Sequence, residues 1–348
     1  MPMLRIGLLG YGFAGATFHA PLIGHSGRTE VGAIASSQAE IAAKAWPQAR
    51  IVADLDALLA DSTIDCIVIA TPNDTHFEFA RRALVAGKHV VVDKPVTLTS
   101  EEARILARMA SDDKLLLAPF HNRRWDGDFL TVQALIASGR LGQITHFESH
   151  FDRFRPMVRQ RWRENTQSGG GLLYDLGPHL IDQALLLFGA PQTVNATVAA
   201  YRENAQADDY VHLQLGYPDK QVVLHASALS ALEAPRFVLH GRRGSYLKTG
   251  LDTQEDQLKA GLRPGQPGWA INPPGQIREV AGDLDLRAEL ATLDGAYVEF
   301  YRAVAATIKD GAPFPVKPGA AVSVAEILEL ARQSAEEGRR LPYVAQGW

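Results

Sequence analysis

The feature that most constrains the fold is an alternation of short apolar runs with amphipathic segments over residues 3–120. Five apolar runs have the length and β-branched content of strands, and they occupy residues 4–10, 31–36, 65–70, 89–93 and 114–120. Helix-like segments separate them. Nearly continuous apolar strands are typical of a parallel sheet that is covered by helices on both faces. The pattern therefore predicts an α/β domain with a doubly wound parallel sheet.

After Phe120 the pattern changes to alternating strand-like segments joined by short turns. Segments such as "TVNATVAAY" and "DDYVHLQLGY" are typical of a largely antiparallel sheet, and helix-like stretches accompany them. We therefore expect a Rossmann domain over residues 1–122 and an α+β domain with an open, mostly antiparallel sheet over residues 123–348. Residues 261–283 are rich in Gly and Pro and are expected to form an excursion or lid.

Composition and charge argue against several classes of function. The net charge of -4 gives no electrostatic reason to expect nucleic acid or an anionic membrane as partner. The longest apolar runs fall short of the ~20 residues that span a bilayer, and the N-terminus lacks the pattern of a signal peptide. The single cysteine, Cys66, cannot form a disulfide within the chain, which fits a reducing compartment. We expect a soluble cytoplasmic protein.

The sequence "GYGFAG" follows the first apolar run directly and is a candidate dinucleotide site. Gly10, Gly12 and Gly15 have the G-x-G-x-x-G spacing, which serves a tight turn, close approach to a pyrophosphate and packing of helix on strand. Phe13 and Ala14 are expected to contact the cofactor too, because the helix N-terminus favours phosphate charge. A plain turn is the alternative, but the position between a strand and a helix favours the cofactor.

The end of the second apolar run indicates which nicotinamide is bound. NAD enzymes usually place an acid about 20 residues after the glycines to hold the ribose 2′-hydroxyl. Here Ser36 and Ser37 occupy that position, and the first carboxylate is Glu40. Two hydroxyls can donate to a 2′-phosphate, although no arginine is present there and only Lys44 follows nearby. Alternatively, both serines simply cap the next helix. We predict NADP(H), with NAD(H) as the alternative.

Two later motifs complete a resemblance to a known family. The stretch "AGKHVVVDKP" ends a strand at Asp93, Lys94 and a proline, and "GGGLLYDLGPHLIDQ" contains Asp175 and His179 four residues apart. Together with the glycines and "TPN", in this order, they resemble the glucose–fructose oxidoreductase/inositol dehydrogenase (Gfo/Idh/MocA) family of nicotinamide enzymes. That family has Glu where this chain has Asp93. The resemblance covers essentially the whole chain and is nearest to the NADP-dependent scyllo-inositol dehydrogenase branch.

The resemblance implies that Lys94, Asp175 and His179 are catalytic. In this hypothesis His179 accepts the hydroxyl proton of a secondary alcohol while hydride passes to the nicotinamide C4. Asp175 would share a helical face with His179 and fix its imidazole, and Lys94 would donate to the developing alkoxide. Taken alone, the acid and the histidine are more simply a helix cap and a core histidine. The resemblance also implies a homodimer or homotetramer formed through the open sheet.

Further candidates lie in segments beside these motifs. The cofactor is expected to contact Asp93, Lys94 and the segment at 71–76, with the candidates Thr71, Pro72, Asn73 and His76. A sugar is expected to stack on aromatic rings and to hydrogen-bond to charged groups, and the candidates are Arg123, Arg124, Trp125, Asp152, Arg153, Trp162 and Tyr174. Arg155 is also expected to turn toward the substrate. For residues 123–126, a linker held by salt bridges is the alternative.

No metal site is predicted. His146, Glu148, His150 and Asp152 share one face of a strand-like segment, but nothing else in the chain completes a ligand set. The leading hypothesis is an NAD(P)-dependent dehydrogenase of an inositol, polyol or sugar, with scyllo-inositol and NADP⁺ as the specific expectation. The alternatives are an enzyme that keeps and recycles a tightly bound nicotinamide, and a non-catalytic protein that senses dinucleotides.

Overall fold

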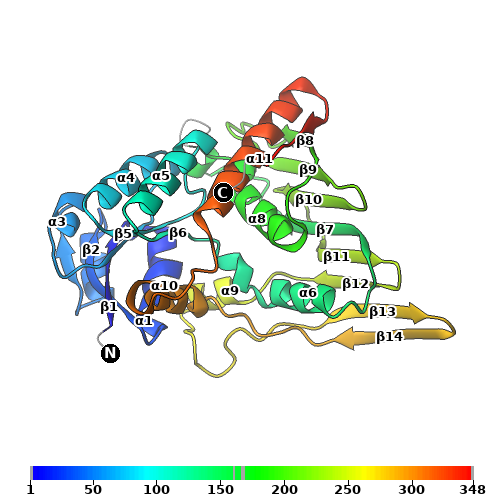
Figure 1. Cartoon of the computed structure of the whole chain (residues 1–348), viewed down its shortest axis with the longest axis horizontal. Coiled ribbons are helices and arrows are strands. Elements are labelled where there is room, and N and C mark those ends of the chain that lie inside the picture. Colours follow the sequence, from blue (N-terminus) through cyan, green and yellow to red (C-terminus); the bar gives the residue numbers. More distant parts are fainter. Residues whose placement is uncertain (1–2, 160, 166–168, 346–348) are drawn as a thin grey trace.

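The computed structural model describes residues 3–159, 161–165 and 169–345, and its described strands form two sheets (Figure 1). The first sheet has six strands in the order β3-β2-β1-β4-β5-β6, all of them parallel. This is the strand order of a doubly wound dinucleotide-binding fold, which confirms the predicted class. The strands are β1 Leu4–Leu9, β2 Thr29–Ala35, β3 Arg50–Val52, β4 Cys66–Ile69, β5 His89–Val92 and β6 Leu117–Pro119.

Helices cover both faces of this sheet, as the continuous apolar strands predict. In β4, Cys66 and Val68 belong to one hydrophobic core, whereas Ile67 and Ile69 belong to another. Successive side chains of a strand point to opposite faces, so both faces are buried. The covering helices of this region are η1 Gly15–His19, α1 Ala20–His25, α2 Ala39–Ala45, α3 Leu55–Leu59, α4 His76–Val85 and α5 Ser100–Asp112.

The second sheet has nine strands among the described residues, in the order β14-β13-β12-β11-β7-β10-β9-β8-β15. All neighbouring strands are antiparallel except β7 and β10, which confirms the predicted open and mostly antiparallel sheet. The strands are β7 Ile144–Asp152, β8 Thr193–Ala199, β9 Tyr210–Gly216, β10 Gln221–Ser227, β11 Pro235–Gly241, β12 Gly244–Thr249, β13 Gly275–Ala281, β14 Leu284–Leu290 and β15 Leu341–Pro342.

The predicted excursion at 261–283 is only partly correct. Residues up to 274 form turns and irregular structure, but β13 pairs with β12 and β14 and extends the second sheet. The short alternation in "QIREVA" is the local signal for this strand, and the neighbouring glycines and prolines obscure it. The short strand β3 was also missed, because its three residues are too few for a periodic pattern.

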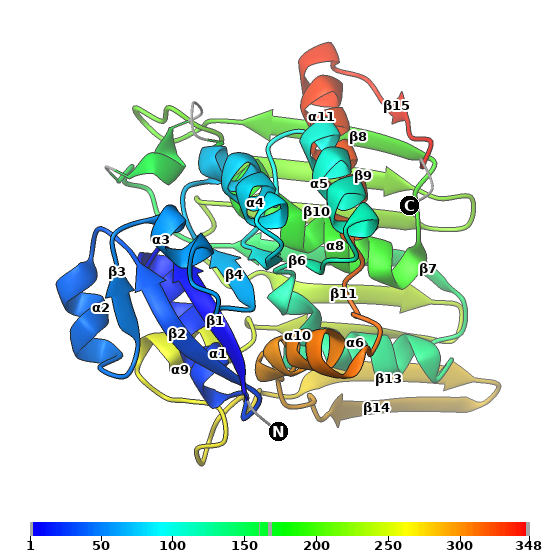
Figure 2. The same ribbon diagram turned by 60° about the vertical axis from the view of Figure 1, so that its left-hand side comes forward.

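The closing helices tie the two sheets together (Figures 1 and 2). α10 Val298–Asp310 packs on α1, and α11 Pro318–Glu337 contacts α5, β8 and α8 Gly177–Phe188. Side chains of α8, α11 and α6 Gly127–Ala137 share the large core of the second sheet. The predicted boundary at residue 122 falls at the start of the short helix η3 Asn122–Trp125 and stays a prediction.

Within the described residues, every helix is too short or too polar to cross a lipid bilayer.

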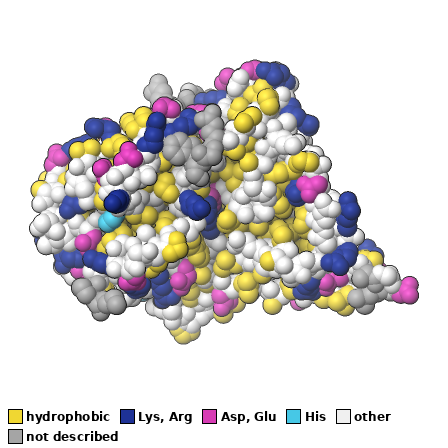
Figure 3. All heavy atoms as spheres, viewed as in Figure 1, with side chains coloured by type: hydrophobic (Ala, Val, Ile, Leu, Met, Phe, Trp, Pro, Cys, Tyr) yellow, Lys and Arg dark blue, Asp and Glu magenta, His cyan; other side chains and the backbone are white. Residues whose placement is uncertain are grey.

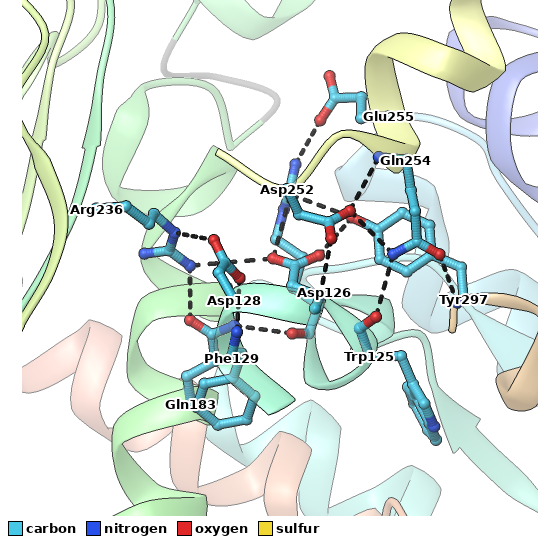
Figure 4. A network of polar contacts seen from close by, with 12 residues as sticks. Trp125, Asp126, Asp128, Phe129, Gln183, Arg236, Asp252, Gln254, Glu255 and Tyr297 are labelled. Atoms are coloured by element: carbon cyan, nitrogen blue, oxygen red, sulfur yellow. Dashed lines mark hydrogen bonds and ion pairs between the residues drawn. The ribbon is translucent and has the colours of Figure 1, made fainter. Parts of the chain in front are cut away.

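A buried network of charges joins Asp126 and Asp128, at the start of α6, to Arg236 on β11 and to Tyr297 (Figure 4). The hydroxyl of Tyr297 donates to Asp126 Oδ1 at 2.5 Å, and Arg236 Nε lies 3.5 Å from Asp128 Oδ2. Arg236 Nη2 also donates to Gln183 Oε1 at 2.9 Å. Burial raises the pKa of both carboxyl groups. Arg123 opposes that rise most for Asp126, with a smaller effect of Arg236, whereas Arg236 opposes it most for Asp128. Arg236 is thus the principal compensating charge for Asp128 and a secondary one for Asp126.

We expect Arg236→Met to destabilise the protein strongly. Arg236 is 2% exposed, and its loss leaves the buried Asp128 without its ion-pair partner and leaves Asp126 with Arg123 alone. Breaking a buried ion pair from one side costs roughly 3–5 kcal/mol. Urea denaturation followed by circular dichroism measures this loss. Arg140→Met is the control, because Arg140 pairs with Glu279 at the surface and should unfold near the wild-type midpoint. Equal midpoints for both variants would contradict the prediction.

Candidate active site

A cavity of about 610 Å³ lies at the carboxyl ends of the first strands and is lined by the predicted glycine loop. Gly10 has φ +97°, and a Cβ on it would lie 2.4 Å from Ala70 O. A Cβ on Gly15 would lie 2.1 Å from Gly10 O, so this glycine allows the helix to pack on the strand. Gly12 lines the cavity, and a Cβ there would meet nothing within 4 Å. The loop therefore leaves open space where a pyrophosphate would approach the backbone, and the residues fit a dinucleotide.

The serines at the end of β2 also line this cavity, together with Phe13 and Ala14. Ser36 Oγ accepts hydrogen bonds from the backbone N–H groups of Tyr11 and Gln38, each at 3.1 Å. Its own O–H remains a donor for the cavity. Ser37 lines the same wall. The serine hydroxyls are therefore available to a ribose or a 2′-phosphate at this position.

Arg82 is a cation of this cavity that the sequence reasoning missed. It lies on α4, pairs with Asp56 and lines the cavity, whereas Lys44 is not among the lining residues. No local pattern points to Arg82, because it stands more than 40 residues after the serines. Asp54 also lines the wall, but its carboxylate accepts from Ala57 N and caps α3.

Some residues of the segment at 71–76 line the nucleotide cavity, and others hold the segment in place through hydrogen bonds within the protein. Thr71 and Pro72 line the nucleotide cavity. Asn73 instead donates from Nδ2 to Gly169 O at 2.9 Å, and both ring nitrogens of His76 face the carbonyls of Pro95 and Thr71. Neither side chain is among the residues that line the nucleotide cavity, which contradicts the expectation that Asn73 and His76 contact the cofactor directly. They hold this loop against its neighbours.

A second cavity, of about 520 Å³, adjoins the first and contains the predicted catalytic residues. Phe13, Ala14, Asp93 and Arg163 line both cavities. Such a shared wall would bring a bound nicotinamide ring next to any substrate in the second cavity. The second cavity is lined from both domains, which places its contents between the two sheets.

Lys94 and Asp175 form an ion pair across the second cavity. Lys94 follows β5, and its Nζ donates to Asp175 Oδ1 at 2.8 Å and to Asp175 O at 2.5 Å. Arg163 Nε lies 3.6 Å from the same carboxylate oxygen. Burial alone would raise the pKa of Asp175, but Lys94 and Arg163 hold it well below its usual range. Asp175 is thus ionised, and one of the three N–H groups of Lys94 is left for a ligand.

The predicted pairing of Asp175 with His179 is wrong. Asp175 ends the short helix α7 Leu172–Asp175, and His179 lies in the first turn of α8. Among the described residues no hydrogen bond joins the two side chains, because the carboxylate is held by Lys94. The helix is interrupted at Leu176, and α8 begins with a proline in its first turn. The two side chains therefore do not share the single continuous helix that their four-residue spacing predicts.

His179 is a neutral side chain in the cavity wall. Burial lowers its pKa well below the usual value, and Lys94 and Arg123 lower it further. Its Nδ1 is shut off from solvent and has no hydrogen-bond partner in the described part of the chain. Since His179 lines the cavity, Nε2 is the nitrogen that remains available to accept a proton there.

Of the predicted substrate contacts, Arg123 and Arg153 line the catalytic cavity. Trp162, in η4 Trp162–Glu164, lines the nucleotide cavity instead, with the guanidinium of Arg163 stacked 4.5 Å from the centre of its ring. Tyr174 lies in the core of the second sheet, and Arg332 covers its ring. Trp162 and Tyr174 are therefore corrected as substrate contacts, because neither reaches the catalytic cavity.

Three further candidates for substrate contact interact with other parts of the protein instead. Arg124 donates from Nε and Nη2 to the carboxylate of Asp182 at 2.8 and 2.6 Å, which agrees with the salt-bridged linker proposed as the alternative. Trp125 packs edge-on against Phe300 with ring centres 5.8 Å apart. Asp152 accepts from His225 Nδ1 at 2.8 Å on the second sheet. None of the three candidates is among the residues that line either cavity.

Asp152 also belongs to the one group of described residues with the spacing of metal ligands. His150, Asp152 and His225 each offer a ligand atom, and these atoms lie within 4.8 Å of one another. His225 on β10 is the residue that the sequence reasoning missed, because only strand pairing brings it beside β7. The expectation that no metal is bound stays a prediction.

The described residues match two models of one oxidoreductase family, and the matches follow the two sheets. Residues 4–121 match the NAD-binding Rossmann fold of the Gfo/Idh/MocA oxidoreductase family. Residues 133–344 match the C-terminal alpha/beta domain of the same family.

Individual relatives cover nearly the whole chain. An uncharacterized oxidoreductase of Escherichia coli, YdgJ, is 46% identical over 334 residues, which are 96% of each chain. The Bacillus subtilis protein named scyllo-inositol 2-dehydrogenase (NADP(+)) IolW is 38% identical over 97% of this chain and 95% of its own. An oxidoreductase structure from Yersinia pestis has a TM-score of 0.95 and 47% identity, covering 99% of this chain and 98% of its own. The chain therefore belongs to the Gfo/Idh/MocA oxidoreductase family.

Proposed function

We propose that the protein is an NADP-dependent dehydrogenase that oxidises a secondary alcohol of an inositol, a polyol or a sugar, or reduces the corresponding ketone. The observation that carries this proposal is the meeting of Lys94, ionised Asp175 and neutral His179 in a cavity that adjoins the nucleotide cavity. Scyllo-inositol is the specific substrate that the name of the Bacillus subtilis relative suggests.

The proposed roles of the residues follow from their geometry. Nε2 of His179 accepts the proton of the alcohol, because burial and nearby cations keep the imidazole neutral. The free N–H of Lys94 donates to the oxygen as negative charge develops on it. Asp175 positions Lys94 by accepting two of its hydrogen bonds, one on the carboxylate and one on the carbonyl. A bound nicotinamide supplies the hydride acceptor.

The preference for NADP(H) rests on the wall of the nucleotide cavity. The serine hydroxyls replace the carboxylate that an NAD enzyme usually places after its second strand. Arg82 adds a cation to the same cavity, although Asp56 pairs with it. A 2′-phosphate would be attracted to Arg82 and would not be repelled at the serines.

The proposal is tested by mixing the purified protein with NADP⁺ or NAD⁺ and a panel of inositols, aldoses and polyols at alkaline pH. Reduced-nicotinamide absorbance should rise for at least one member, scyllo-inositol included, and more strongly with NADP⁺. His179→Asn should lower kcat by roughly 10²- to 10⁴-fold and leave NADP⁺ affinity nearly unchanged. Normal turnover by that variant would rule out the base. Tight cofactor binding without net absorbance change would favour a recycled nicotinamide or a sensing protein.

The pH dependence of oxidation should show an unusually low acid limb. The base works only when His179 is neutral, and burial with Lys94 and Arg123 lowers its pKa well below 6.5. Protonation therefore removes activity only at a pH below that of an ordinary histidine. The profile of kcat/KM against pH with NADP⁺ measures the limb. An acid limb at or above pH 6.5 would contradict the neutral, buried base.

Two glycine variants should separate cofactor binding from folding. Gly12→Ala should keep the melting temperature, because its Cβ meets nothing within 4 Å, but should weaken NADP⁺ binding roughly tenfold or more by filling the phosphate approach. Gly10→Ala should lower the melting temperature, because φ is +97° and Ala70 O lies 2.4 Å from the new Cβ. Differential scanning fluorimetry and a fluorescence titration measure the two effects. Wild-type NADP⁺ affinity in Gly12→Ala would exclude this site.

A further inference from the structure

The catalytic cavity carries a large excess of positive charge among its described lining residues. Five arginines of the segment after β7 line it, and they are Arg153, Arg155, Arg159, Arg161 and Arg163. Lys94, Arg123 and Lys259 add three more cations, against the carboxylates of Asp93, Asp175 and Glu255. The face of the molecule drawn in Figure 3 mixes basic and acidic side chains. The described lining of the cavity is instead strongly biased toward cations.

The carboxylates of the cavity are already occupied. Asp175 is held by Lys94, and Glu255 pairs with Arg123 and, at 2.6 Å, with Lys259. Burial raises the pKa of Glu255, but nearby cations, of which Arg123 has the largest effect, hold it at about 2. Asp93 accepts the backbone N–H of Lys94. Within the arginine segment, only Arg163 forms an ion pair with one of these three acids among the described residues, and its partner is Asp175.

Arg153 and Arg155 are held in place by their backbones and have no ion pair within the described residues. Arg153 N donates to Ser227 O at 2.9 Å, and Arg155 N donates to Ala228 O at 2.7 Å. Both side chains are half-buried. Burial lowers the pKa of Arg155, and Arg153 lowers it further by repulsion. Like charges packed beside an open cavity are relieved by an anion.

The cofactor does not account for these two arginines. Arg163 lines both cavities, whereas Arg153 and Arg155 line the catalytic cavity and are absent from the lining of the nucleotide cavity. A small cavity beside the catalytic one is also lined by both. The anion that they fit is therefore carried by the substrate.

We propose that the substrate is a polyol or sugar bearing an anionic group, a carboxylate or a phosphate monoester, which Arg153 and Arg155 bind while its secondary alcohol reaches Lys94 and His179. This inference rests on the proposed dehydrogenase function. It places anionic polyols ahead of neutral inositols such as scyllo-inositol. Guanidinium groups suit both kinds of anion, because their N–H groups match paired oxygen atoms.

Kinetics on matched pairs of substrates test the proposal. With NADP⁺, kcat/KM is measured for glucose against glucuronate, and for myo-inositol against myo-inositol 1-phosphate. The anionic member of at least one pair should exceed the neutral one by about 10- to 100-fold, and the pair that responds distinguishes carboxylate from phosphate. Arg155→Gln should remove most of this preference by raising KM for the anionic member of the pair. Arg108→Gln, on the exposed face of α5, is the matched control.

Anion binding is measured independently of turnover. The melting temperature of NADP⁺-saturated protein should rise with inorganic phosphate or tartrate, relative to chloride at equal ionic strength, and Arg155→Gln should abolish the rise. Faster turnover of neutral substrates with no such rise overturns the inference and leaves the proposed function intact. An anion-dependent rise without turnover of any substrate supports the site and counts against the dehydrogenase. If no substrate is turned over and the melting temperature does not rise, both the anion site and the dehydrogenase function are refuted.

Discussion

The ion pair between Lys94 and Asp175 is the interaction on which the arrangement of the site depends. Lys94 comes from the end of β5 in the first sheet, and Asp175 ends α7 beside the second sheet, so the pair joins the two domains where the cavities meet. Its side chains are only 12% and 23% exposed. A pair this shielded interacts more strongly than one at the surface, but each charge also becomes costly without the other. The same contact thus joins the two domains and orients Lys94.

Local periodicity made much of the fold predictable. The alternation of apolar runs predicts a doubly wound sheet because each buried strand needs helices on both faces. The glycine spacing predicts its own turn, since Gly10 and Gly15 are each required by a backbone oxygen that a Cβ would strike. The strand β3 is not predictable in this way, because three residues are too few to show a periodic pattern. The strand at Gly275 was hidden among glycines and prolines that ordinarily mark a loop.

The site was less predictable, because its side chains are selected by partners that are distant in the sequence. Spacing alone paired Asp175 with His179, but Lys94, 81 residues earlier, holds the carboxylate. Asp182 likewise holds Arg124, and His225 holds Asp152. A polar side chain near a motif is not free to bind a ligand when another charged residue of the protein already forms its hydrogen bonds. Arg82 shows the reverse case, in which a distant helix supplies a cation that the local motif lacks.

The cations of the catalytic cavity connect its two proposed tasks. Lys94 and Arg123 help to keep His179 neutral and so ready to accept a proton. The same positive field stabilises an alkoxide as the proton leaves, because charge of opposite sign develops within a shielded space. An anionic substrate would reduce the repulsion among the arginines and would also weaken the field that keeps the imidazole neutral. In the proposed arrangement the anion is bound by Arg153 and Arg155, which form no ion pair among the described residues, and Lys94 keeps its free N–H for the reacting oxygen.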